Sequence, residues 1–286
     1  MKILVTGGCG FIGHELIQKL SVNKNNQVYS LDNNFAGART VKRENVFYIK
    51  ADTRDIKTLV DFKPDVVYHL GEYSRISTSF EDVEKVWKYN VNGTFQVLQF
   101  CLENNSKIIY AGSSSKFGNR GKDENLSPYA WVKSKNVELI KNFNKWFGLQ
   151  YAIAYFFNVY GKEQISSGKY ATVIGIFEEQ YRAGNQISVV LPGTQKRYFT
   201  HIEDTIDGLM QIAKNGAGDG YCLCDEGSLF SIEEVARMFS NDIVYLPEQP
   251  GNRTDPILHN YRFRELGWSP KHSLIDYIHE LKKDKK

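Results

Sequence analysis

The chain has 286 residues, of which 42% are hydrophobic, so it can bury a large core in one large domain or in two closely joined ones. This composition excludes an intrinsically disordered protein. The net charge of +3 is carried entirely by residues 282–286, which contain four lysines and one aspartate, so no binding to nucleic acid is expected.

Cysteine usage and hydropathy favour the cytoplasm. Four cysteines suit a reducing compartment better than a disulfide framework, and Cys222 and Cys224 are expected to pack in the core, so no metal site is predicted. No apolar run approaches the length of about 18 residues that suggests a membrane span. Met1 leads directly into a core strand, without a signal peptide. We therefore expect a cytoplasmic protein that does not contact membranes.

The first predicted strand runs into a glycine-rich turn that opens a helix. Gly7 can adopt the backbone angles of a tight turn, Gly10 lets the main chain approach a pyrophosphate, and Gly13 lets the helix pack closely on the strand. The open N–H groups at the helix start, from Phe11 and Ile12 onward, favour a phosphate. The turn therefore predicts a dinucleotide site.

The second predicted strand, residues 27–31, ends at Asp32, nineteen residues after Gly13. An acid at this position can bind both hydroxyls of an adenosine ribose and would repel a 2′-phosphate. NAD is therefore favoured over NADP, with Asn33 and Asn34 of the following loop beside it.

Strands and helices alternate through the first half of the chain, which predicts an α/β fold with a Rossmann-type, doubly wound parallel sheet. Further strands are expected at 46–49, 66–70, 107–111 and 151–156, and helices at 11–20, 56–62, 80–101 and 129–147. Ligand groups in such sheets gather at the carboxyl ends of strands. The side chains and turns expected there are Gly7, Asp32, Asp52, Gly71 and Ser113.

The regular alternation ends near residue 160. Helices at 171–183 and 231–239 and strands at 187–191 and 197–201 suggest a smaller, mixed lobe. We predict an NAD-binding domain over residues 1–160 and a mainly substrate-binding lobe over 161–286, with some segments returning to the first domain.

Tyr129 and Lys133 lie four residues apart, on one face of a predicted helix. A free phenol titrates near pH 10, and a neighbouring ammonium group and a positive nicotinamide ring would favour the phenolate. Ser113, at the end of a strand, can bond to the same substrate oxygen. These three residues are the predicted catalytic group.

The chain resembles the extended short-chain dehydrogenase/reductases of the nucleotide-sugar epimerase and dehydratase group, including UDP-glucose 4-epimerase-like members. The resemblance runs from the glycine-rich turn through Ser113, Tyr129 and Lys133 to Leu266-Gly-Trp268. It implies the same catalytic trio, with Lys133 also binding the nicotinamide ribose. The further cofactor-binding residues that it implies are Asp52, Thr53, Leu70, Gly71, Asn90, Tyr129 and Phe156.

The same resemblance implies a substrate side for a nucleotide sugar. Asn158 would lie near the substrate phosphates, and Arg197 and Arg253 would clamp the diphosphate, since a guanidinium donates paired hydrogen bonds to phosphate. Ser114 and the backbone around Val189 complete the predicted substrate residues.

The chain departs from the family pattern at several positions. Glu72 stands where small residues are usual, Tyr155 where an arginine is usual, and Phe117 where a tyrosine is usual. The loop between Ser113 and Tyr129 is also short, which leaves the identity of the sugar open.

Three reaction types share this scaffold. Dehydratases of the group carry Asp and Glu directly after the catalytic serine, whereas this chain has Ser114 and Ser115, which cannot act as carboxyl acids or bases. Dehydration is therefore disfavoured, and the same absence of a glutamate argues against decarboxylation. A 4-epimerase acting on a UDP-hexose, in the glucose/galactose or N-acetyl form, is favoured; the alternative is a reductase or dehydrogenase that releases NADH.

Two long predicted helices, 86–101 and 129–147, carry apolar faces. The family often pairs these helices across a two-fold axis, so a homodimer is expected.

Overall fold

The computed structural model describes residues 1–117, 124–251 and 262–283, and its centre is a seven-stranded sheet. The strand order is β11-β6-β5-β4-β1-β2-β3, and every neighbouring pair is parallel. The strands are β1 (Lys2–Thr6), β2 (Gln27–Asp32), β3 (Val46–Lys50), β4 (Val66–His69), β5 (Lys107–Ser113), β6 (Tyr151–Phe156) and β11 (Gly218–Leu223). This arrangement confirms the predicted Rossmann-type α/β fold.

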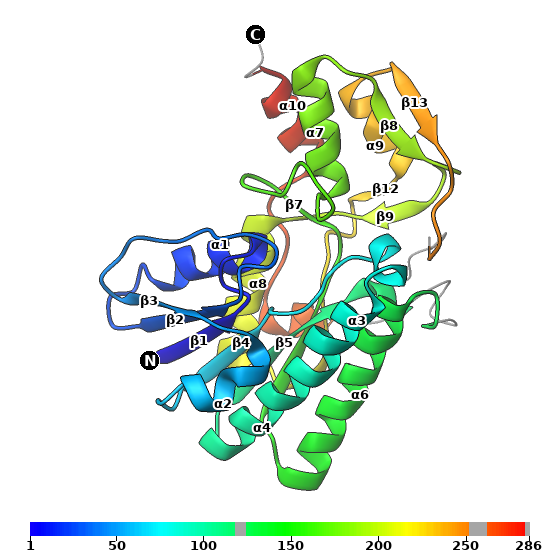
Figure 1. Cartoon of the computed structure of the whole chain (residues 1–286). Helices are drawn as coiled ribbons and strands as arrows, with labels where there is room; N and C mark the ends of the chain where they lie inside the picture. Colours follow the sequence, from blue (N-terminus) through cyan, green and yellow to red (C-terminus); the bar gives the residue numbers. More distant parts are fainter. Residues whose placement is uncertain (118–123, 252–261, 284–286) are drawn as a thin grey trace.

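Helices cover both faces of the sheet, as Figure 1 shows. One face carries α1 (Phe11–Leu20) and α8 (Ile202–Asn215), and the other carries α2 (Ile56–Leu59), α4 (Thr94–Asn104) and α6 (Pro128–Phe147). Strand order reverses between β1 and β4, which lie side by side although β2 and β3 separate them in sequence. Ligands of such sheets bind in the crevice that this reversal opens at the carboxyl ends of the strands.

The start of α6 follows from its sequence. Ser127 is the N-cap, with its Oγ accepting the N–H of Ala130 at 3.1 Å, and Pro128 occupies the first helical position, where it needs no hydrogen bond. The helix ends at Gly148, which is in the left-handed conformation. Both signals fix the first turn of α6, where Tyr129 lies.

The single helix predicted over residues 80–101 is divided into several segments. They are η2 (Ser77–Phe80), α3 (Val83–Val86), the π-helical η3 (Trp87–Gly93) and α4. Gly93 packs directly on η1 (Thr53–Asp55), since a Cβ atom there would lie 2.3 Å from Thr53 Oγ1. Asn90 bonds to the backbone of Tyr73 from the same π-helical turn. Tertiary contacts therefore set the local helix type.

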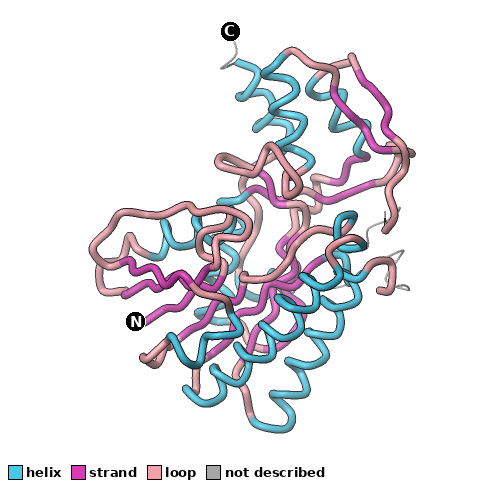
Figure 2. Tube along the Cα trace, viewed as in Figure 1, coloured by secondary structure: helices cyan, strands magenta, loops and turns pink. Residues whose placement is uncertain are grey.

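The second lobe has its own core beside the sheet domain (Figures 1 and 2). Its helices are α7 (Val173–Ala183), α9 (Ile232–Phe239) and α10 (Leu274–Lys283), and its parallel strand pair is β8 (Ile187–Val190) with β13 (Ile243–Leu246). The strand predicted over 197–201 is split, because its two halves have different partners. β9 (Lys196–Tyr198) pairs with β12 (Leu229–Ser231), and β10 (Thr200–His201) pairs with β7 (Val159–Tyr160).

Segments from the second half of the chain complete the first domain. Strand β11 forms the edge of the main sheet beside β6, and α8 packs against the same sheet. Asp204 of α8 also holds the end of the chain, since its Oδ2 accepts the N–H groups of Lys271 and His272 at 3.0 Å.

All four cysteines are buried. Within residues 1–117, 124–251 and 262–283, no helix combines the length and the apolar character that crossing a membrane requires.

The contact between α1 and the turn after β1 can be tested with Gly13→Ala. A Cβ atom at Gly13 would lie 2.1 Å from the carbonyl oxygen of Gly7, so the helix must shift, and we expect a loss of about 1–3 kcal/mol of stability. Urea unfolding of the protein without cofactor measures this loss. Gly227→Ala is the control, since its Cβ would meet only Asp225 Oδ1 at 3.4 Å. Equal stability of both variants would contradict the close packing.

Candidate active site

A cavity of about 680 Å³ opens at the carboxyl ends of the central strands. The β1–α1 turn and the ends of β2, β4, β5 and β6 form its wall on the sheet side, and residues of α7 and β8 form the opposite wall. The cavity therefore lies between the two lobes and is large enough for a cofactor and part of a substrate.

The glycine-rich turn lines one end of this cavity. Gly7 has a φ of +72°, and a Cβ atom there would lie 2.7 Å from the carbonyl carbon of Leu70, so only glycine fits. Gly10 is the N-cap of α1 and provides no side-chain cap, which leaves the first N–H groups of the helix available for a phosphate. The predicted residues Gly7, Gly10, Phe11, Ile12 and Gly13 all line the cavity.

Asp32 lies at the end of β2 and also lines the cavity. Its Oδ2 accepts the N–H of Cys9 at 2.9 Å and its Oδ1 accepts the N–H of Asn34 at 2.6 Å. Burial raises the pKa of this carboxyl group, and the two backbone hydrogen bonds oppose the shift. Asn33 lines the cavity too, whereas Asn34 does not and instead forms the turn, with a φ of +62°.

The two residues predicted to bind the adenine differ in whether they line the cavity. Thr53 lines the cavity, and Asp52 does not. The Asp52 carboxylate accepts hydrogen bonds from the backbone and side chain of Arg54. Burial raises the pKa of Asp52, but the bonds from Arg54 outweigh it and leave the pKa below its ordinary value. Leu70, Gly71 and Phe156, which are also predicted to bind the cofactor, line the cavity.

These features fit a dinucleotide. A helix start with open N–H groups suits a pyrophosphate, and an aspartate at the end of the adjacent strand suits a ribose diol. The glycine contacts leave the main chain accessible at the helix start. Both elements border the same cavity as the three predicted catalytic residues.

Ser113, Tyr129 and Lys133 all line the same cavity. The Lys133 Nζ atom lies 6.0 Å from the centre of the Tyr129 ring. Ser113 Oγ accepts hydrogen bonds from the hydroxyl of Ser115, at 2.8 Å, and from its N–H, at 3.2 Å. The phenol, the ammonium group and the hydroxyl thus border one space.

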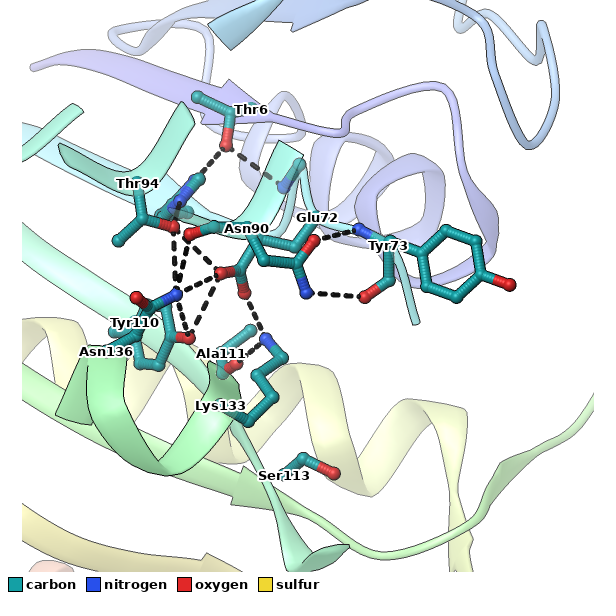
Figure 3. Close-up of polar contacts among 12 residues, drawn as sticks. Thr6, Glu72, Tyr73, Asn90, Thr94, Tyr110, Ala111, Ser113, Lys133 and Asn136 are labelled. Carbon is teal, nitrogen blue, oxygen red and sulfur yellow. Dashed lines mark hydrogen bonds and ion pairs between the residues drawn. The ribbon is translucent and has the colours of Figure 1, made fainter. Parts of the chain in front are cut away.

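Glu72 forms a buried ion pair with Lys133, as Figure 3 shows. The side chains of Glu72 and Lys133 are only 2% and 5% exposed. Lys133 Nζ also donates to the carbonyl oxygen of Ala111 at 2.6 Å. A buried carboxylate keeps its charge only where several donors satisfy it.

The second carboxylate oxygen of Glu72 has those donors. Glu72 Oε1 accepts from Thr94 Oγ1 at 2.8 Å, Asn136 Nδ2 at 2.9 Å and the Tyr110 hydroxyl at 3.1 Å. Burial, reinforced by the Glu72 charge, raises the pKa of Tyr110 well above its ordinary value, so this phenol stays a donor. The network fixes the carboxylate, and through it Lys133.

His69 extends the network toward β1 without adding charge. Its Nε2 bonds to Thr94 Oγ1 at 2.9 Å and its Nδ1 to Thr6 Oγ1 at 2.7 Å. Burial lowers the pKa of His69 to about 4, with Lys133 contributing and Glu72 opposing, so the ring is neutral at neutral pH. The Lys133 charge is therefore balanced by Glu72 alone among these groups.

Asn90 is buried and does not line the cavity. Its Oδ1 accepts the N–H of Tyr73 at 2.7 Å, its Nδ2 donates to Tyr73 O at 2.9 Å, and its carbonyl oxygen accepts Asn136 Nδ2 at 2.7 Å. Asn90 thus connects η3 to the loop after β4 and to α6 (Figure 3).

The predicted substrate residues occupy different environments. Ser114, Asn158 and Arg197 line the cavity, and Asn158 is held by a 2.8 Å bond from Nδ2 to the carbonyl oxygen of Tyr198. Val189 is fully buried in the second core, and its neighbours in β8, Ser188 and Val190, line the cavity instead. Strand alternation explains this difference. Arg253 lies outside the described residues.

The other departures from the family pattern lie away from the cavity. The Tyr155 hydroxyl donates to Asp219 Oδ1 at 2.7 Å, and the ring of Phe117 packs against Tyr155 with centroids 4.9 Å apart. Phe117 ends η4 (Ser114–Phe117), and residues 118–123 of the short loop lie outside the described part of the chain.

His201, Glu203 and His272 form a cluster of metal-ligand type outside the cavity. His201 caps α8 by accepting the N–H of Glu203 at 3.3 Å, and His272 Nδ1 lies 3.0 Å from Asp204 Oδ1. Both bonds stabilise the first turn of α8.

Several cavity residues were not predicted from the sequence. Phe35, Arg75 and Tyr89 come from the sheet domain, and Thr172 and Gln195 come from the second lobe. Arg75 lies three positions after Glu72, in the loop after β4. A charged residue so close to the end of a strand is the sequence signal that indicates Arg75 as a site residue.

Similar proteins share the sequence pattern and the fold. The profile of the NAD dependent epimerase/dehydratase family matches residues 3–223. A putative UDP-glucose 4-epimerase of Methanocaldococcus jannaschii is 30% identical over 96% of this chain and 95% of its own length. UDP-glucuronic acid decarboxylase 5 of Arabidopsis thaliana is 27% identical over 99% and 89%. The crystal structure of a UDP-glucuronic acid 4-epimerase mutant from Bacillus cereus, with NAD bound, has a TM-score of 0.86 and 26% identity over 99% of both chains.

Substitution of Glu72 tests the buried pair. Glu72→Gln leaves the Lys133 ammonium group without a counter-charge, so we expect a loss of about 3–5 kcal/mol of stability in urea unfolding. Glu103→Gln is the matched control, because the Glu103–Lys57 pair is exposed and should contribute less than about 1 kcal/mol. If both variants lose the same small amount, the pair does not hold the site together.

Proposed function

Because the chain belongs to the NAD dependent epimerase/dehydratase family, we propose that it is a nucleotide-sugar 4-epimerase that acts on a UDP-linked hexose. Membership confirms the resemblance to extended short-chain dehydrogenase/reductases, and the cofactor is NAD. The glucose/galactose and N-acetyl forms are the first substrates to test. The relatives named above include both epimerases and decarboxylases, so the reaction type has to be argued from the site.

The residues after Ser113 carry the choice of reaction. Ser114 and Ser115 form the first turn of η4, and Ser115 is hydrogen-bonded to Ser113. Hydroxyl groups cannot exchange protons as carboxyl groups do at neutral pH. Glu72 is the buried carboxylate beside Lys133, and its oxygens are already bonded to four side chains. This arrangement favours epimerisation over dehydration or decarboxylation.

In the proposed reaction, Tyr129 takes the proton of the sugar 4-hydroxyl and later returns it. When bound, NAD supplies the hydride acceptor and donor. Ser113 would bond to the same sugar oxygen, and Lys133 would bond to the nicotinamide ribose; the bonds of Lys133 to Glu72 and Ala111 support this role by fixing its position. Asn158 and Arg197 would hold the diphosphate while the 4-keto sugar rotates and presents its opposite face to the cofactor.

A reductase or dehydrogenase that releases NADH is the second candidate. It would use the same three residues but would consume or accumulate NADH in step with the sugar. Mass and chromatographic analysis of products from UDP-glucose and UDP-N-acetylglucosamine separates the possibilities. An epimer has unchanged mass, whereas oxidation, dehydration and decarboxylation each change it.

Tyr129→Phe removes only the hydroxyl that is proposed to transfer the proton. We expect turnover of the nucleotide sugar to fall roughly 10²–10⁴-fold, while bound NAD is retained. Tyr245→Phe is the control, because Tyr245 is an exposed tyrosine of β13 in the second lobe. Turnover within a few-fold of the wild type in Tyr129→Phe would rule out the assigned role.

We also propose that the enzyme is a cytoplasmic homodimer built on two helical faces. The segments α3 to α4 and the helix α6 expose an apolar surface, and the rings of Trp87 and Trp131 stack across it with centroids 6.4 Å apart. Its exposed side chains are Phe80, Val83, Trp87, Phe95, Trp131, Trp146 and Phe147. An exposed surface that gathers this many large apolar side chains on a single chain favours a protein partner. The four buried cysteines fit the cytoplasm.

Trp131→Glu tests the dimer. A charge at a central aromatic residue should raise the dissociation constant of the dimer at least about 30-fold, the equivalent of about 2 kcal/mol. Analytical ultracentrifugation over a concentration series measures it, with Tyr245→Glu as the control on the other lobe. A wild-type protein that remains monomeric would refute the proposal.

A further inference from the structure

Arg75 places a further cation in the cavity that contains Tyr129. In the described parts of the chain, no acidic side chain forms an ion pair with it; its hydrogen-bond acceptors are neutral. Nη1 donates to the carbonyl oxygen of Ser74 at 2.9 Å and to its hydroxyl at 3.4 Å, and Nη2 donates to the carbonyl oxygen of Tyr170. The buried Nε atom has no acceptor there.

The surroundings of Arg75 are aromatic. Burial lowers the pKa of the guanidinium group, and the phenols of Tyr129, Tyr73 and Tyr170 oppose the shift. An arginine nevertheless stays charged at neutral pH, because its ordinary pKa is so high. Arg75 is therefore a permanent cation. The carbonyl oxygen that accepts its Nη2 belongs to Tyr170, which packs against the buried cluster that contains Tyr129.

Lys133 and Arg75 differ in how their charges are balanced. Glu72 balances the charge of Lys133, whereas no acidic side chain of the described residues pairs with Arg75. A partly buried cation without a counter-ion is costly, and a bound anion would offset that cost. Lys133 is paired with Glu72, and Arg75 has no acidic partner within residues 1–117, 124–251 and 262–283; together these observations predict an anionic group on the ligand.

We propose that Arg75 binds a carboxylate on the sugar, so that the substrate is a nucleotide-linked hexuronic acid. The inference rests on the nucleotide-sugar binding of the proposed function and narrows the sugar from a neutral hexose to an acidic one. Tyr129 is the residue assigned to the reacting sugar carbon. Arg75 lines the same cavity and bonds to Tyr170, which packs against the cluster that contains Tyr129. The planar guanidinium group suits a carboxylate, which it can bind through two parallel hydrogen bonds.

The other anions of the complex have separate sites. The pyrophosphate of the cofactor suits the N–H groups at the start of α1, and the substrate diphosphate is assigned to Asn158 and Arg197. A sugar carboxylate is the anion that remains for Arg75, which lines the same cavity as Tyr129.

Binding to the NAD-loaded Tyr129→Phe protein tests the proposal without turnover. Calorimetric titration compares UDP-glucuronic acid with UDP-glucose, which differ by a carboxylate in place of a hydroxymethyl group. We expect the uronic acid to bind at least about 10-fold more tightly, as a charge-assisted hydrogen bond predicts. Adding Arg75→Gln should lower this ratio about 10-fold or more, and Arg75→Lys should restore part of it.

Arg182→Gln is the matched control, since Arg182 is an exposed arginine of α7 that pairs with Glu178. It should leave the ratio of the two affinities unchanged. Thermal unfolding of each variant checks that Arg75→Gln is folded, and Arg75→Lys keeps the test valid if it is not.

Three results would overturn the proposal. They are equal affinities for the two sugars, an unchanged ratio in Arg75→Gln, and an Arg75→Gln variant whose only defect is weaker NAD binding, which would assign Arg75 to the cofactor diphosphate. Failure of the proposed function gives a different result. In that case the uronic acid binds through Arg75, but the enzyme with Tyr129 intact does not convert it to the 4-epimer.

Discussion

The ion pair between Glu72 and Lys133 is the interaction on which the active-site end of the cavity depends. It joins the loop after β4 to α6, and the other Glu72 oxygen joins both to β5 and α4 through Tyr110 and Thr94. Charge removed from water is costly, and these hydrogen bonds offset part of that cost. Lys133 is consequently fixed by the protein before any ligand arrives.

The Glu72–Lys133 pair changes the charge balance in the cavity that Tyr129 lines. An unpaired ammonium group would favour the phenolate by itself, but the adjacent carboxylate cancels much of its field. Arg75 is a separate cation on the lining of the same cavity, without an acidic partner among the described residues. Glu72, which itself lines the cavity, thus changes the charge balance of the site through its pairing with Lys133.

Local signals in the sequence were sufficient for the parts of the site that depend on the backbone. The glycines after β1, Asp32 at the end of β2, and the Ser127-Pro128 start of α6 all place groups through short-range geometry. They predicted the sheet and the wall of the cavity that it supplies.

Long-range contacts explain what the sequence did not reveal. The π-helical turn η3 depends on Asn90 and Gly93 meeting segments far along the chain. Glu72 was recognised as unusual, but its partner on α6 is 61 residues away, and no periodicity connects them. Val189 was assigned to the substrate, whereas the alternation of β8 turns its neighbours to the cavity, because strand register is a property of the fold.

The position of β11 has a consequence for how the protein is made. Strand β6 pairs with β5 on one side, and its other edge is covered only by β11, residues 218–223. During synthesis that edge stays open while the whole first part of the second lobe emerges, and an open strand edge is a template for unwanted pairing. The two lobes are therefore one unit of assembly, and a nascent chain cut at the apparent domain boundary would present a sheet without its last strand.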